Sequence, residues 1–198
     1  MALKIERKLI LASASPSRKM LLEQAGLDFE AGVSFEVVVS GVDETVPASL
    51  SPAQTVELLA ERKGKAVLPL RPDKPIIAAD SVVSIDGLIL GKPKDDQEAK
   101  ATLRRLSGRT HQIFTGVCLL ANGREEVFHQ STKVTFYPLT EEEIADYVAL
   151  GESQGRAGAY GIEGIGVVLV QSIEGDYSNI VGLPVAETLR RLRKLLHA

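Results

Sequence analysis

The stretch Leu9–Gly26 reads LILASASPSRKMLLEQAG, an apolar run followed by a serine-rich turn and a segment that suits a helix. We expect a short strand at its start and then a helix that Ser15 caps and Pro16 begins. Serine oxygens accept hydrogen bonds from helix N–H groups, and proline fits the first helical position. Gly26 would end this helix. The order of strand, turn and helix is typical of an α/β fold.

The start of this predicted helix is a candidate anion site. Its first turn leaves backbone N–H groups unpaired and partially positive, and Ser13, Ser15 and Arg18 add polar and cationic side chains nearby. Phosphate, sulfate or carboxylate would be stabilised there. An ordinary capped helix with a solvated arginine accounts for the stretch equally well, so the segment alone leaves both interpretations open.

Composition restricts the class of protein. The chain has 198 residues, 44% hydrophobic and 25% charged, which is enough for one sizeable core or two small lobes. A net charge of −3 argues against a broad surface for nucleic acid. The single cysteine, Cys118, lies in an apolar run, which favours a buried, inert thiol. Neither a secretory signal nor a long apolar segment stands out, so we expect a cytoplasmic protein without a membrane partner.

Strand and helix signals are mixed along the rest of the chain, which predicts a mixed sheet flanked by helices. Expected strands are 29–39, 76–85, 88–90, 111–120, 126–136 and 167–172. Further helices are expected at 51–66, 95–108, 140–151 and 185–196, with a turn at 175–179. Asp86-Gly87 and Asn122-Gly123 between apolar runs predict two-residue hairpins.

The first hairpin carries a second set of candidate residues. Asp80 follows the apolar run 76–79, where an unpaired charge is costly. A two-residue turn sets a register that carries Ser81 opposite Lys92, which makes Lys92 a neighbour of Asp80. Strict alternation puts Asp80 and Lys92 on opposite faces, so a direct pair requires a bulge or a strand end. A structural ion pair at a sheet edge and a carboxylate for metal or water beside a phosphate-binding lysine both fit.

Other charged and flexible segments are less decisive. Asp43 and Glu44 lie in a polar loop, where a solvated charge pair is the default and metal binding or base catalysis the alternative. Lys63 lies near the end of the second helix, where a cation complements the helix dipole. The run Gly155–Gly166 contains five glycines, so its backbone could approach a ligand closely, although a flexible turn explains it almost as well. The histidines show no metal-ligand spacing.

Short motifs along nearly the whole chain resemble, in order, those of the Maf proteins, nucleoside triphosphate pyrophosphatases also described as septum-formation proteins. The motifs are Ser13–Arg18 (the family's SxSPxR), Val42–Glu44, Leu59–Lys63 (LAxxK), Ala79–Ser81, Gly91–Pro93, Leu106–Gly108, Ala157–Tyr160 and Gly182–Pro184. Each is weak alone, but eight in sequence are a strong match. The resemblance implies an elongated, mixed β-sheet of the Maf/ITPase-like type, flanked by helices with a central cleft. It also implies one domain over residues 1–198, with two lobes around that cleft, and a homodimer.

The resemblance further implies hydrolysis between the α- and β-phosphates of a nucleotide, which yields a nucleoside monophosphate and pyrophosphate and uses Mg²⁺ or Mn²⁺. Asp80 matches the position of the catalytic base and a metal ligand, and Glu44 matches a second metal-binding carboxylate. The positions that hold the substrate phosphates are Ser13, Ser15, Arg18, Lys63 and Lys92. One role for this chemistry is the removal of non-standard nucleotides before polymerases use them. The alternative is a non-catalytic, nucleotide-binding regulator of cell division.

Three residues at family specificity positions leave the base open: Ser17, Ser81 and Glu163. In the branch that acts on dTTP and UTP these positions typically hold arginine, threonine and glutamine, and in the 7-methyl-GTP branch an aromatic residue, glutamine and glutamate. Ser81 and the motif Ala157–Tyr160 lie closer to the pyrimidine branch, whereas Glu163 matches the other. A carboxylate accepts a hydrogen bond from a purine N1–H or a pyrimidine N3–H, so the interpretation leans only slightly to pyrimidines.

Overall fold

The computed structural model describes residues 7–26 and 35–197. The chain forms two compact units. The first comprises Met1–Asp80, Thr115–Gln130 and Gly182–Ala198, and the second comprises Ser81–Phe114 and Ser131–Val181.

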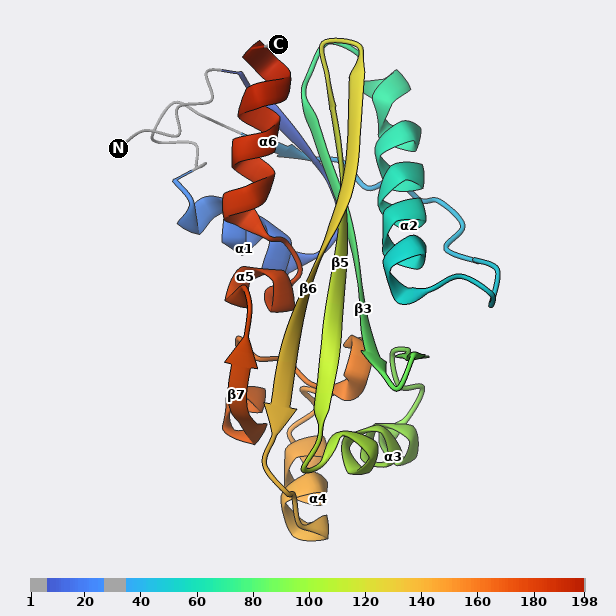
Figure 1. The fold of residues 1–198 in the computed structure, drawn as a ribbon, viewed down its shortest axis with the longest axis vertical. Helices are drawn as coiled ribbons and strands as arrows, with labels where there is room; N and C mark the ends of the chain where they lie inside the picture. Colours follow the sequence, from blue (N-terminus) through green and yellow to red (C-terminus); the bar gives the residue numbers. More distant parts are fainter. Residues whose placement is uncertain (1–6, 27–34, 198) are drawn as a thin grey trace. The chain divides into compact units, whose positions relative to one another are not determined.

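Within the described residues, one sheet of seven strands has the order β2-β1-β3-β5-β6-β7, with β4 paired to β3 (Figure 1). The strands are β1 (Leu9–Ala12), β2 (Phe35–Val37), β3 (Ile76–Ile85), β4 (Leu88–Leu90), β5 (Thr110–Ala121), β6 (Arg124–Phe136) and β7 (Val170–Glu174). Strand β1 is parallel to β2 and β3, whereas the pairs β3–β4 and β6–β7 are antiparallel. The predicted α/β fold with a mixed sheet is confirmed.

The helices are α1 (Pro16–Gln24), α2 (Pro52–Val67), α3 (Asp96–Leu106), α4 (Glu141–Ala149), α5 (Tyr177–Val181) and α6 (Val185–His197), with short 3-10 segments at Leu68–Leu70, Ala157–Ala159 and Ile165–Leu169. Four helices begin where the capping residues predict, because Ser15, Ser51, Asp95 and Thr140 each accept a hydrogen bond from the backbone N–H three residues later. In the first unit, Figure 1 shows α2 and α6 on opposite sides of the strands. No helix in the described ranges combines the length and apolar character needed to cross a membrane.

Three predicted elements differ from the structure. Residues 29–34 of the strand expected at 29–39 lie outside the described part, and β2 itself covers only Phe35–Val37. The strand expected at 167–172 begins at Val170, because a 3-10 segment precedes it. The turn expected at 175–179 becomes helix α5 from Tyr177, since the Asp176 carboxylate caps it by accepting hydrogen bonds from Ser178.

Both predicted hairpin turns are present. Asp86 and Gly87 have φ of 53° and 78°, and Asn122 and Gly123 have φ of 53° and 73°. Positive φ at both central residues is what a type I′ turn requires, and this turn matches the twist of the strands it joins. The local sequence was therefore sufficient to locate both hairpins.

The ladder of the first hairpin is shorter than its turn predicts. Val83 pairs with Leu90 in the expected register, but β4 ends there. The expected placement of Ser81 opposite Lys92 as a strand pair is therefore wrong. The reason is that the carbonyl of Gly91 accepts a hydrogen bond from the backbone of the glycine-rich run instead of continuing the strand.

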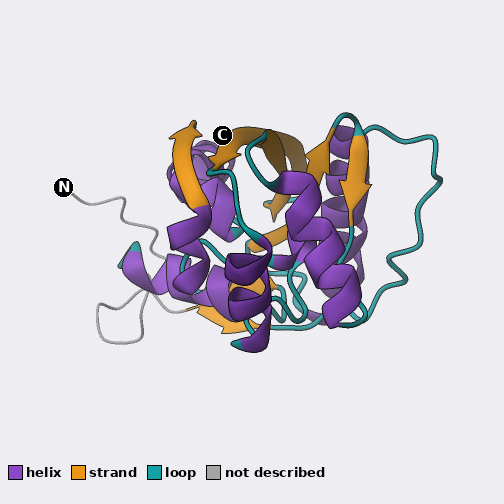
Figure 2. Ribbon diagram, turned by 90° about the horizontal axis from the view of Figure 1, so that it is seen from below, coloured by secondary structure: helices purple, strands orange, loops and turns teal. Residues whose placement is uncertain are grey.

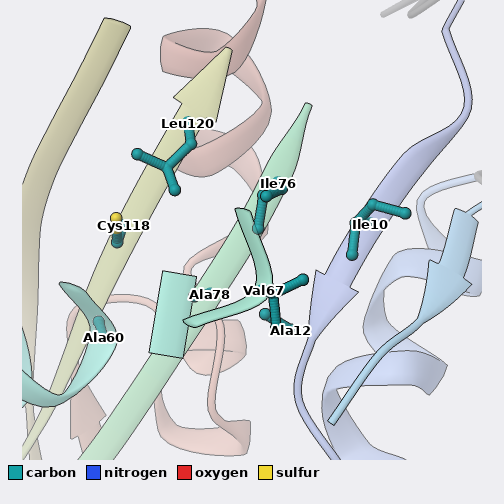
Figure 3. Packing of buried hydrophobic residues seen from close by; sticks show 8 residues of the cluster. All are labelled: Ile10, Ala12, Ala60, Val67, Ile76, Ala78, Cys118 and Leu120. Atoms are coloured by element: carbon teal, nitrogen blue, oxygen red, sulfur yellow. The ribbon is translucent and has the colours of Figure 1, made fainter. Parts of the chain in front are cut away.

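The core of the first unit packs α2 against the sheet. Its buried cluster consists of Ile10, Ala12, Ala60, Val67, Ile76, Ala78, Cys118 and Leu120 (Figure 3). The helix approaches β5 closely at Gly116, where an added Cβ would lie 2.2 Å from the carbonyl oxygen of Val56. Burial raises the pKa of the Cys118 thiol to about 12, which agrees with the inert thiol expected from the sequence.

The core of the second unit contains a cluster of three rings. His111, Phe136 and Tyr160 contact one another edge to face, with ring centroids 4.7 to 5.5 Å apart. The Nε2 atom of His111 lies 2.8 Å from the Tyr160 hydroxyl oxygen. Burial lowers the pKa of His111 to about 4, so its imidazole is neutral at pH 7.

We expect Gly116→Ala to lower the free energy of unfolding by at least about 2 kcal/mol, because the new methyl group has to displace the α2 backbone. Gly91→Ala is the matched control, since nothing lies within 4 Å of a Cβ there and its φ is not positive. Urea unfolding followed by circular dichroism measures both. Equal stability of the two variants would show that α2 does not depend on this close approach.

We expect His111 to make stability fall as the pH drops. The unfolded histidine takes up its proton near pH 6.5 and the folded one near pH 4. The unfolded state therefore binds more protons in this window, and the contribution is complete above about pH 6.5 and lost progressively down to pH 4. Its size is about 3 kcal/mol. Unfolding free energies of wild type and His111→Gln between pH 4 and pH 7 test this, because only the wild-type curve should include the histidine contribution. Parallel curves would contradict it.

Candidate functional site

Arg18 is buried in the first turn of α1, with 9% of its surface exposed. Its Nε donates a hydrogen bond to the carbonyl oxygen of Gly182 at 2.7 Å, and its Nη1 donates to Ser13 Oγ at 3.1 Å. Ser13 Oγ also accepts from the backbone N–H of Ser15, at 3.2 Å. The interpretation as a plain capped helix with a solvated arginine is therefore wrong, because the serine-rich turn and a distant glycine hold the guanidinium in place.

The charge of Arg18 is balanced within the first unit. Burial lowers the pKa of Arg18, and the negative charges of Asp80 and Glu44 act against that shift. Arginine stays protonated in proteins, so its burial requires such compensation. The two carboxylates expected to act on metal or water therefore interact electrostatically with the arginine expected to bind phosphate.

Lys63 joins the same two carboxylates. Its Nζ lies 2.5 Å from Asp80 Oδ1 and 2.7 Å from Glu44 Oε1. The side chains of Lys63 and Asp80 are 11% and 12% exposed, whereas Glu44 is 56% exposed. The lysine thus makes a largely buried ion pair with a carboxylate on β3, instead of only complementing the dipole at the end of α2.

The loop that carries Glu44 is attached to the same helix. Residues 38–51 run between β2 and α2 as a long loop, which Figure 2 shows projecting beyond α2. Thr45 makes one hydrogen bond within this loop and one to α2. Its N–H donates to Asp43 Oδ1 at 2.9 Å, and its carbonyl oxygen accepts from Arg62 Nη1 at 2.7 Å. Because Glu44 lies between these contacts and Lys63 follows Arg62, one anchor brings the carboxylate and the lysine together.

The remaining sequence-predicted residues lie elsewhere in the two units. Ser17 is in α1 of the first unit, while Ser81, Lys92 and Glu163 belong to the second. Glu163 Oε1 accepts a hydrogen bond from Arg156 Nη1 at 2.6 Å. The structure thus brings Ser13, Ser15, Arg18, Glu44, Lys63 and Asp80 together within the first unit.

Sequence reasoning missed three contributors to these contacts: Arg62, Arg156 and the carbonyl of Gly182. Arg62 and Arg156 carried one weak signal each, a position beside Lys63 and a position within the glycine-rich run. Gly182 lies in the motif Gly182–Pro184, but its carbonyl carried no chemical signal, because every residue has one. It lies 164 positions from Arg18, so only the fold brings the two together.

The chemistry of the carboxylates fits a hard divalent cation. Glu44 and Asp80 each place an oxygen against the same ammonium nitrogen, so these oxygens lie near one another. Mg²⁺ is commonly held by one or two carboxylates, with water and substrate phosphates completing its shell. In the described ranges, no group of three or more His, Cys, Asp or Glu side chains is arranged to hold a metal. The pair could supply two oxygen ligands to such an ion.

Residues 8–195 match the family model described as Maf, Maf-like protein. The chain belongs to the Maf family. The resemblance inferred from the eight motifs is thereby confirmed.

Two close relatives of this Maf chain carry the same name. It is 49% identical over 189 residues to a dTTP/UTP pyrophosphatase of Geobacillus sp., covering 96% of this chain and 98% of that protein. It is 48% identical over 188 residues to a dTTP/UTP pyrophosphatase of Bacillus cytotoxicus, covering 95% of each. A solved nucleoside-triphosphatase / dITP/XTP pyrophosphatase from Mycobacterium abscessus aligns with a TM-score of 0.47 and 18% identity over 95% of this chain and 97% of that one, a likeness too distant to support an inference.

We expect Lys63→Met to lower the free energy of unfolding by about 3 kcal/mol, because it leaves the buried carboxylate of Asp80 without its cation. The double variant Lys63→Met/Asp80→Asn should lose less unfolding free energy than the sum of the losses in Lys63→Met and Asp80→Asn. Lys65→Met is the control on the same helix. It also removes an ion-paired lysine, but one that is 50% exposed, so it should change stability little. A Lys63→Met protein as stable as Lys65→Met would contradict the prediction. Chemical denaturation of wild type, the two single variants, the double variant and Lys65→Met measures these differences.

Proposed function

We propose that this protein is a nucleoside triphosphate pyrophosphatase that hydrolyses dTTP and UTP between the α- and β-phosphates. The products are the nucleoside monophosphate and pyrophosphate. Membership of the Maf family supports this, together with the name dTTP/UTP pyrophosphatase of relatives at 47–49% identity. The structural observation that carries the proposal is the buried group of Arg18, Lys63 and Asp80, in which two cations lie with a carboxylate suited to activate water.

The triphosphate requires cations and hydrogen-bond donors. Arg18 offers a guanidinium that Ser13 and Gly182 already orient, so little conformational entropy is lost when phosphate binds. Ser13 and Ser15 add hydroxyls at the start of α1, where the helix dipole favours negative charge. We assign further phosphate contacts to Lys63 and to Lys92.

Asp80 serves as the general base in this proposal. Its carboxylate can take a proton from a water molecule, and the resulting hydroxide attacks the α-phosphorus while the bond to the bridging oxygen breaks. The electron pair of that bond leaves with pyrophosphate. Lys63 holds Asp80 Oδ1 at 2.5 Å and so fixes the orientation of the base.

Glu44 and Asp80 would hold the divalent cation, Mg²⁺ or Mn²⁺. When bound, such an ion neutralises phosphate charge and fixes the orientation of the phosphate chain. Lys63 contacts both carboxylates, so we expect it to exchange part of this contact for phosphate when nucleotide binds. The position of Lys63 is favourable with or without bound nucleotide, because its ammonium group lies beside negative charge in either state.

We assign base recognition to Ser17, Ser81 and Glu163. A carboxylate accepts hydrogen bonds and cannot donate them. Thymine and uracil present a donor at N3–H, whereas cytosine presents an acceptor at N3, so Glu163 should favour the first two bases over cytosine. The names of the relatives point to the same bases.

Product analysis on a panel of nucleotides tests the proposal. With Mn²⁺ or Mg²⁺, wild type should convert dTTP and UTP to monophosphate and pyrophosphate, without orthophosphate, and CTP should react more slowly. Removal of the metal with EDTA should abolish turnover, and added metal should restore it. Asp80→Asn should lower kcat by at least about 100-fold, because asparagine cannot accept the proton.

Asp86→Asn is the control for this experiment. Asp86 is an exposed aspartate in the hairpin turn that follows the same strand, and asparagine tolerates its positive φ. It should keep wild-type turnover. The proposal fails if triphosphates are bound and returned intact, if orthophosphate is the product, or if Asp80→Asn retains wild-type activity.

A further inference from the structure

Side chains of the same unit account for two of the glycines in the second half of the glycine-rich run. Residues 161–166, here called the base loop, carry Glu163 and include three glycines. A Cβ at Gly161 would lie 2.5 Å from the Cζ atom of Arg156, and a Cβ at Gly164 would lie 1.6 Å from Glu152 Oε1. Side chains of the same unit therefore occupy the space that these glycines leave, and no ligand is needed to explain the two residues.

Glu152 holds the end of the base loop. Its Oε1 accepts a hydrogen bond from the N–H of Ile165 at 3.0 Å, and its Oε2 accepts from the N–H of Gly166 at 2.8 Å. Two successive backbone N–H groups that converge on one anion form the arrangement by which proteins bind phosphate, and here the protein's own carboxylate fills it. The end of the loop is thus ordered without a ligand.

Tyr147 links Glu152 to the beginning of the base loop. Its hydroxyl donates to Glu152 Oε2 at 2.8 Å and accepts from the N–H of Gly161 at 3.2 Å. Burial raises the pKa of Tyr147, so the phenol keeps the proton that it donates. One tyrosine and one glutamate therefore hold both ends of the loop, and the loop has a defined conformation before any nucleotide binds.

Arg156 holds the side chain in the middle of the base loop. Its Nη1 lies 2.6 Å from Glu163 Oε1, and the two side chains are 33% and 17% exposed. Its guanidinium also lies over Gly161, as the close approach there shows. A planar guanidinium packed on backbone and bonded to one carboxylate oxygen restricts the orientation of that carboxylate more than a mobile lysine could.

We propose that Arg156 is a specificity-determining positioning residue, which orients the Glu163 carboxylate within a base loop that Glu152 and Tyr147 hold. This inference rests on the proposed function, which assigns Glu163 to the base. A carboxylate held in place discriminates an N3–H donor from an N3 acceptor, whereas one that rotates and is hydrated accommodates either base with water. Arg156 therefore acts on the choice of base and not on the reaction at the α-phosphorus.

A double-mutant cycle tests this inference through steady-state kinetics with UTP and CTP. Arg156→Met should lower the ratio of kcat/KM for UTP to that for CTP by about tenfold, mainly through KM for UTP, with kcat nearly unchanged. In the background of Glu163→Gln the same substitution should change the ratio less than about twofold, because its partner charge is absent. Arg156→Lys should restore part of the ratio. Arg105→Met, an exposed arginine of the same unit, is the control that should leave the ratio unchanged.

Two outcomes of the cycle would overturn the inference. The first is an equal loss of kcat/KM for UTP and CTP, which would indicate a merely structural role. The second is an effect of Arg156→Met that persists undiminished in the background of Glu163→Gln.

Hydrogen exchange separates this inference from the proposed function. The amides of Ile165 and Gly166 should exchange slowly in wild type and at least about tenfold faster in Glu152→Gln, which replaces one acceptor oxygen with a donor group. Unchanged exchange would overturn the assignment of Glu152. A wild-type protein that hydrolyses no nucleotide but shows this exchange pattern would overturn the proposed function and the role in base choice, and it would support the structure of the base loop.

Discussion

The ion pair between Lys63 and Asp80 is the interaction on which the rest of the candidate site depends. It joins α2 to β3, and it is largely buried, so each charge is tolerated only because the other is present. The helix that carries Lys63 lies directly against β5, where Gly116 leaves no side chain between the two backbones. The packing of α2 on the sheet therefore also positions a charge of the candidate site.

Around this pair, opposite charges alternate. Glu44 reaches Lys63 from a loop that Arg62 anchors, and Arg18 experiences the charges of Asp80 and Glu44 from the start of α1. Such a group is stable without a ligand, because each cation has a carboxylate near it. A triphosphate with a divalent ion brings both signs of charge, so it can replace these internal pairs without leaving a buried charge uncompensated.

Much of the fold could be predicted because its signals are local. Ser15, Ser51 and Thr140 cap helices by bonding to N–H groups three residues later, and two-residue turns such as Asn122-Gly123 require only their own backbone angles. Some errors arose where a distant contact changed the local outcome, as at the end of β4, where the carbonyl of Gly91 accepts a hydrogen bond from the backbone of Gly158. The strand expected at 167–172 starts at Val170 because the 3-10 segment Ile165–Leu169 precedes it, and Glu152 accepts hydrogen bonds from the backbone at the start of that segment.

By itself, the sequence determined the fold class, the family and the identity of the residues to examine, because motifs and caps are encoded by neighbours along the chain. Only the tertiary structure decided how those residues are paired. Nothing in the sequence paired Asp80 with Lys63, or Arg18 with a carbonyl 164 positions away, and the structure shows both contacts. Such contacts depend on how closely helices and strands pack, and that distance is set by the whole core rather than by any local pattern.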